Sequence, residues 1–159
     1  MTKKVSSITG FSGYAKSRLP LTEMTMKEDR QTDIIGLPFV VIVAEQHPIV
    51  RASIAALLSH DGYRVFQAEN MNATLSCINR IPDLAVLLVD LDMPGWKSIV
   101  QHALDTAPDA LVVAMAGVER IPEISALNQR GVQVCLQKPV IYKDVCQAIS
   151  EIIGRRRAA

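Results

Sequence analysis

Cysteine is scarce in this 159-residue sequence, which contains Cys77, Cys135 and Cys146 alone. An odd number of cysteines without CxxC spacing excludes a disulfide framework and a zinc ribbon. The three histidines also lack the spacing of a metal cluster. We therefore expect a protein of a reducing compartment, the cytoplasm.

Neither charge sign is in excess, since 17 lysines and arginines stand against 16 acidic residues, for a formal net charge of +1. This balance gives no indication of general attraction to nucleic acids or membranes. Long apolar runs are also missing, because residues 39–44 and 85–89 fall far short of the roughly 20 that span a bilayer. No signal peptide is expected, because polar residues follow Lys3 and Lys4.

Hydrophobic residues make up 49% of the chain, enough for the core of one domain with a modest appendage. Residues 1–38 show no apolar periodicity and predict a flexible N-terminal arm. The folded domain is expected over residues 39–154, followed by a basic tail at 155–159. We interpret the arginines of this tail as solvated, or as a contact to nucleic acid or an acidic partner.

Short apolar runs alternate with helical patterns throughout residues 39–154, which is typical of repeated βα units. The candidate strands are residues 39–44, 64–68, 85–90, 111–115 and 133–136. Each intervening helix is expected to end near a glycine or proline: Gly62, Pro82, Pro108, Gly131 and Gly154. The pattern predicts an α/β fold of the flavodoxin-like (βα)5 type, a three-layer sandwich whose parallel sheet has strand order 2-1-3-4-5.

Charged side chains follow the strands that flank the reversal of this order. Glu45 follows the first strand, Asp90 ends the third, and Lys138 follows the fifth. The carboxyl ends of parallel strands meet at one edge of the sheet, so we expect two acids and a lysine in one crevice. This set suits a hard divalent cation and a phosphoryl group.

Three segments at this edge are VVIVAEQHPIVR, VLLVDLDMPG and GVQVCLQKPV. With them, residues 39–154 resemble the response-regulator receiver family. The resemblance implies that Asp90 accepts a phosphoryl group from a histidine kinase or phosphotransfer protein, and that Lys138 contacts this group. It also implies Mg2+ at Glu45, Asp90 and the backbone carbonyl of Asp92, and a cis peptide bond between Lys138 and Pro139.

Three positions depart from the family pattern. Gln46 replaces a metal-binding aspartate, Ala116 replaces a Thr or Ser hydroxyl, and Cys135 replaces an aromatic residue. An amide is a poorer Mg2+ ligand than a carboxylate, so we expect weak Mg2+ binding. The missing hydroxyl predicts that phosphorylation shifts the conformation less than in an intact receiver.

The leading hypothesis is a stand-alone receiver of a two-component phosphorelay, since only residues 155–159 follow the last helix; it would act by docking on a downstream protein. The alternative is a pseudo-receiver that serves as a phosphorylation-independent interaction scaffold. A phosphohydrolase with Asp90 as its nucleophile ranks third, because the sequence offers no independent general acid or base. We therefore expect a binding module and not an enzyme, with no membrane partner and no direct nucleic-acid partner.

Overall fold

The computed structural model describes residues 38–158, so all of the predicted arm (residues 1–38) except Pro38 lies outside the described part and stays a prediction. The strands are β2 (Val40–Ala44), β3 (Arg64–Ala68), β4 (Leu84–Asp90), β5 (Leu111–Ala116) and β6 (Val132–Gln137). The helices are α2 (Pro48–His60), α3 (Met71–Arg80), α4 (Trp96–Thr106), the 3-10 segment η2 (Val118–Glu123), α5 (Ile124–Gln129) and α6 (Tyr142–Ala158). The alternation of strand and helix confirms the predicted βα units.

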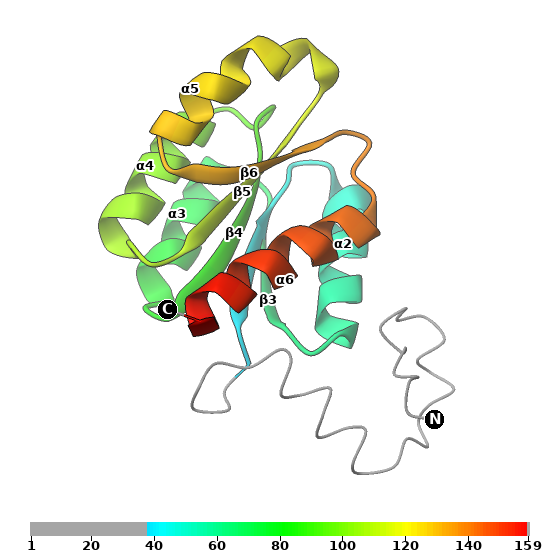
Figure 1. Ribbon diagram of the computed structural model, residues 1–159, viewed down its shortest axis with the longest axis vertical. Coiled ribbons are helices and arrows are strands. Elements are labelled where there is room, and N and C mark those ends of the chain that lie inside the picture. The colour runs from blue at the N-terminus through cyan, green and yellow to red at the C-terminus, as the bar shows by residue number, and fades with distance from the viewer. Residues whose placement is uncertain (1–37, 159) are drawn as a thin grey trace.

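The five strands form one parallel sheet in the order β3-β2-β4-β5-β6. This order is the predicted 2-1-3-4-5, and it reverses between β2 and β4. Helices α2 and α6 cover one face of the sheet, whereas α3 and α4 cover the other (Figure 1). The fold is therefore the flavodoxin-like three-layer sandwich.

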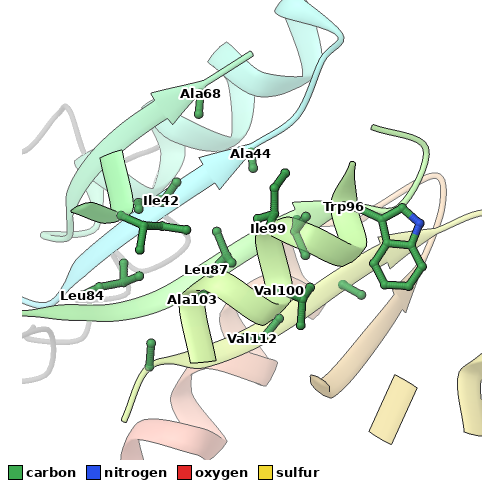
Figure 2. Packing of buried hydrophobic residues seen from close by; sticks show 14 of the residues in the cluster. Ile42, Ala44, Ala68, Leu84, Leu87, Trp96, Ile99, Val100, Ala103 and Val112 are labelled. Carbon is green, nitrogen blue, oxygen red and sulfur yellow. The ribbon is translucent and has the colours of Figure 1, made fainter. Parts of the chain in front are cut away.

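Two apolar cores lie on the two faces of the sheet, because successive strand residues point to opposite sides. Ile42 and Leu87 pack with Ile99 of α4 in one core, and Figure 2 shows these side chains between the strands and the helix. Val41 packs with Ile149 of α6 in the other core. Every residue of β2, β4 and β5 is buried, which explains their continuous apolar runs.

The segment between β5 and β6 differs from a regular helix. Its first half is the 3-10 segment η2 with Pro122 inside it, and α5 contributes only six residues. Proline lacks the N–H that a continuing α-helix needs, which accounts for the irregular start.

The last helix also differs from the expectation, because α6 continues through Gly154 to Ala158. A single glycine costs a helix only about 1 kcal/mol relative to alanine, and the arginines that follow are good helix formers.

Candidate functional site

The structure brings Glu45, Asp90 and Lys138 to the carboxyl edge of the sheet, as the topology predicts. Asp90 ends β4 and is 1% exposed, while Glu45 follows β2 and is 3% exposed. Lys138 follows β6, and its Nζ donates a hydrogen bond of 2.5 Å to Asp90 Oδ1. A partly exposed ammonium therefore neutralises a buried carboxylate.

Lys138 directly follows β6 and precedes Pro139. The Lys138–Pro139 peptide bond is cis, which confirms the prediction. Partial burial alone would lower the pKa of Lys138, but hydrogen bonds to Asp90 and Asp92 outweigh this effect and raise it. The side chain therefore stays charged throughout the physiological pH range.

Asp92 contributes more to the site than the sequence indicated. Its backbone N–H donates to Asp90 Oδ1 at 2.9 Å, as a turn residue can. Its carboxylate, to which the sequence analysis assigned no role, accepts hydrogen bonds from Lys138 Nζ at 3.0 Å and from Arg120 Nε at 3.1 Å. The hydrogen bond from Lys138 is the main cause that holds the pKa of Asp92 below its ordinary value, and Arg120 adds to it.

Glu45 is held in the crevice by the chain that follows it. Its Oε1 accepts a hydrogen bond from the His47 N–H at 2.8 Å, and Arg51 Nη1 donates to its backbone carbonyl at 2.9 Å. Burial raises the pKa of Glu45, and the charge of Asp90 raises it further, whereas the His47 N–H and Lys138 oppose the shift. A cation in this crevice would offset the unfavourable free energy of the two buried, like-charged carboxylates.

Gln46 faces the same turn from the exposed side. Its amide Nε2 lies 3.4 Å from the carbonyl oxygen of Asp92. The Asp92 carbonyl is one of the predicted Mg2+ ligands. The Gln46 amide therefore contacts a predicted ligand, whereas an aspartate at position 46 would itself bind the cation beside it.

The oxygen donors at this edge are of the kind that Mg2+ takes. Two carboxylates, Glu45 and Asp90, and the Asp92 carbonyl are available, and Mg2+ commonly takes only one or two protein carboxylates together with water. Within residues 38–158, no group of three His, Cys, Asp or Glu side chains is arranged to hold a metal. The three donors, Glu45, Asp90 and the Asp92 carbonyl, are therefore fewer than the ligands of a dedicated metal site.

The other two unusual positions lie beneath and beside the site. Ala116 ends β5, is 3% exposed and packs in the apolar core, so its methyl group offers no hydrogen bond. Cys135, on β6, is partly buried against the same core, and burial raises the pKa of its thiol. All three cysteines are free.

Arg120 is the site residue that our sequence reasoning missed. It lies in η2, where the irregular backbone gives no helical period from which its direction could be inferred. The one available signal was a basic residue five positions after the predicted end of the strand at residues 111–115. In the structure, the Arg120 side chain binds the carboxylate of Asp92, beside Asp90 and Lys138.

Comparison with known proteins identifies the family of the chain. The family model of the response regulator receiver domain matches residues 41–150. A two-component response regulator of rice, ORR11 from Oryza sativa subsp. indica, is 24% identical over 122 residues, which cover 74% of this chain and 83% of the relative.

Solved structures show the same fold. A receiver domain protein from Clostridium thermocellum has a TM-score of 0.70 at 22% identity, covering 76% of this chain and 98% of that one. A response regulator from Burkholderia pseudomallei, solved with a phosphorylated aspartic acid, a calcium ion and citrate, has a TM-score of 0.66 at 21% identity, covering 76% and 71%.

A parallel flavodoxin-like sheet with two acids and a lysine at its switch point is the arrangement that the resemblance to receiver domains predicts. The chain belongs to the response regulator receiver family. No helix in the described part of the chain is both long and apolar enough to cross a membrane.

Proposed function

We propose that this chain accepts a phosphoryl group at Asp90 from a histidine kinase or phosphotransfer protein, and then signals by docking on a downstream protein. The observation that carries the proposal is the contact between the buried Asp90 carboxylate and Lys138 Nζ at the switch point of the sheet. The three free cysteines fit a cytoplasmic location.

The chemistry is a displacement at phosphorus. Oδ1 of Asp90 is held by Lys138 and by the Asp92 N–H, so we assign the attack to Oδ2. A bond forms between this oxygen and phosphorus while the phosphorus–nitrogen bond of the donor breaks, and its electron pair stays on the donor nitrogen. Lys138 then holds negative charge on the transferred group, because a preformed cation stabilises such charge without reorganisation.

Magnesium, if bound, would be held by Glu45, Asp90 and the Asp92 carbonyl oxygen. It would supply positive charge that offsets the phosphoryl oxygens. We expect its binding to be weak, since Gln46 contributes no charge.

The edge around the site carries exposed apolar side chains that fit a docking surface. Ile49 and Val50 begin α2 and are 71% and 38% exposed, and Ile141 precedes α6 and is 61% exposed. A protein that delivers a phosphoryl group to Asp90 must approach this edge. We expect Ile49→Ser to slow transfer from a protein donor and to leave labelling by a small phosphodonor unchanged.

The direct test is incubation of the full chain with phosphoramidate and MgCl2, followed by intact mass and peptide mapping. We expect one phosphoryl group on Asp90, and none on the Asp90→Asn variant. Asp109→Asn is the matched control, because Asp109 is an exposed acid before β5, at the opposite edge of the sheet. Labelling that persists in Asp90→Asn would contradict the proposal.

A second candidate is a scaffold that binds its partner without phosphorylation. The contact of Gln46 with the Asp92 carbonyl and the missing hydroxyl at Ala116 favour it. Complete absence of label on the wild type, together with unchanged partner binding by Asp90→Asn, would support the scaffold. Rapid release of phosphate from many substrates would instead support a phosphohydrolase.

A further inference from the structure

Arg120 is joined to the acceptor aspartate through one intervening carboxylate. Arg120 Nε donates to Asp92 Oδ1 at 3.1 Å, while Lys138 Nζ donates to Asp92 Oδ2 at 3.0 Å and also contacts Asp90. Asp92 thus holds two cationic side chains, one on each oxygen. Its own backbone N–H donates to Asp90, which fixes this carboxylate beside the acceptor.

The second cation changes the charge of the site. Gln46 has removed one negative charge from the expected acidic pair, and Arg120 adds one positive charge at the same edge. Glu45, Asp90 and Asp92 therefore face Lys138 and Arg120. A site with this balance attracts a dianionic group more strongly than a site with an aspartate at position 46 and no Arg120.

The Arg120 guanidinium is able to exchange its partner. It is 29% exposed and its partner Asp92 is 38% exposed, and ion pairs at such positions are weak because water and salt screen them. A guanidinium has five N–H donors, and within the described residues two of them are engaged, by Asp92 and by Glu123 at 3.1 Å. A phosphoryl group offers three acceptor oxygens and about two negative charges, which suits bidentate binding by arginine.

Nothing else at this edge replaces the missing hydroxyl. Ala116 presents a methyl group, and within residues 38–158 Lys138 is the one cationic side chain that contacts Asp90. We propose that Arg120 is a second phosphoryl-binding residue, which leaves Asp92 when Asp90 is phosphorylated and binds the phosphoryl oxygens together with Lys138. This inference rests on the proposed phosphorylation of Asp90.

The exchange would also transmit the signal. Arg120 lies in η2, whose backbone is tied to the end of β5 by the hydrogen bond from Arg120 N–H to the Gly117 carbonyl at 3.0 Å. Movement of the guanidinium toward Asp90 pulls on η2 and on α5, which follows directly.

The test is a titration of the full chain with beryllofluoride, a phosphoryl mimic, at a fixed MgCl2 concentration, followed by NMR. We expect Arg120→Ala to weaken beryllofluoride binding by at least about tenfold, the loss of a hydrogen bond to a charged group. Arg120→Lys should restore part of the affinity, because it keeps the charge but not the bidentate geometry. The Arg120 Nε–H resonance, identified by its loss in Arg120→Lys, should shift on binding.

Arg130→Ala is the matched control, since it removes the same charge from an exposed position that follows α5. It should change the affinity by no more than about twofold, as surface substitutions usually do. Unchanged affinity of Arg120→Ala would overturn the inference, and tighter binding would show that the Arg120–Asp92 pair obstructs the site.

Failure of the two proposals is distinguishable by the labelling of Asp90 in the wild type. Without phosphoramidate label or beryllofluoride binding, the proposed function and the role of Arg120 both fail. With label on Asp90 but equal affinity of wild type and Arg120→Ala, only the role of Arg120 fails.

Discussion

The backbone N–H of Lys138 donates a hydrogen bond of 2.8 Å to the carbonyl of Ala116. This bond joins the end of β5 to the lysine that contacts Asp90, so a side chain at position 116 lies at the same edge as the acceptor. We expect a hydroxyl introduced here to reach a phosphoryl group on Asp90, as the family pattern implies for this position.

We predict that Ala116→Thr strengthens beryllofluoride binding by about tenfold or more, because a hydrogen bond to a charged group contributes roughly 1.5–3 kcal/mol. The variant should be less stable without ligand by about 1–3 kcal/mol, since the new hydroxyl is buried in an apolar core. Ala114→Thr is the control, because Ala114 lies two residues earlier in the same strand and packs in the same core. Equal gains in affinity for the two variants would contradict the prediction.

A second prediction concerns Gln46. Replacing it with aspartate should raise Mg2+ affinity by more than tenfold, since a unit charge about 4 Å away contributes up to ~4 kcal/mol at an effective dielectric of 20. The single tryptophan, Trp96, is buried at the start of α4 just after the acceptor turn and provides a fluorescence readout. Gln46→Ala removes the amide without adding charge, so it should not reproduce the gain. If it does, release of the Asp92 carbonyl, and not charge, controls Mg2+ binding.

A third prediction follows from the raised pKa of Glu45, which burial and then the charge of Asp90 cause. The native state holds the Glu45 proton more tightly than the unfolded chain does. The free energy of unfolding therefore falls as the pH rises from 4.5, the ordinary pKa of a glutamate, through the raised pKa of Glu45. The Glu45→Gln variant has no buried negative charge at this position, and its amide oxygen still accepts the hydrogen bond from the His47 N–H. Without metal, the variant should match the wild type below pH 4.5 and become more stable as pH rises to neutrality.

Urea unfolding of both proteins in buffers with EDTA across this range measures the difference directly. The higher stability of Glu45→Gln relative to the wild type should shrink when MgCl2 is added, because a bound cation relieves the repulsion between Glu45 and Asp90 in the wild type. A difference in stability that is independent of pH would show that Glu45 is not the titrating group.

The strand order and the central site could be predicted because both follow from strong, local signals. The buried runs of β2, β4 and β5 are continuous, and the rule for strand ends then places Glu45 and Asp90 together. Arg120 and the side chain of Asp92 could not be placed in this way. Their contact depends on the irregular path of η2 around Pro122, for which the sequence offers no period.

Contacts between distant helix ends also escape sequence reasoning. Tyr142 and Asp61 are 81 positions apart, and neither belongs to a motif that pairs them. Only the packing of α2 beside α6 on one face of the sheet brings them together.

The last prediction concerns this pair. Tyr142 OH donates to Asp61 Oδ2 at 2.8 Å, and Asp61, at the C-terminal end of α2, is 6% exposed. Burial raises the pKa of Tyr142, and the neighbouring Cys146 and Asp61 add to the shift, so the hydroxyl remains a donor at any ordinary pH.

Tyr142→Phe should cost about 1.5–3 kcal/mol of stability, because it removes a hydrogen bond to a charged acceptor. A double-mutant cycle with Asp61→Ala, measured by urea unfolding, isolates the pair. Coupling below about 0.5 kcal/mol, the usual limit of additivity for independent sites, would show that the hydroxyl does not stabilise the contact between α2 and α6.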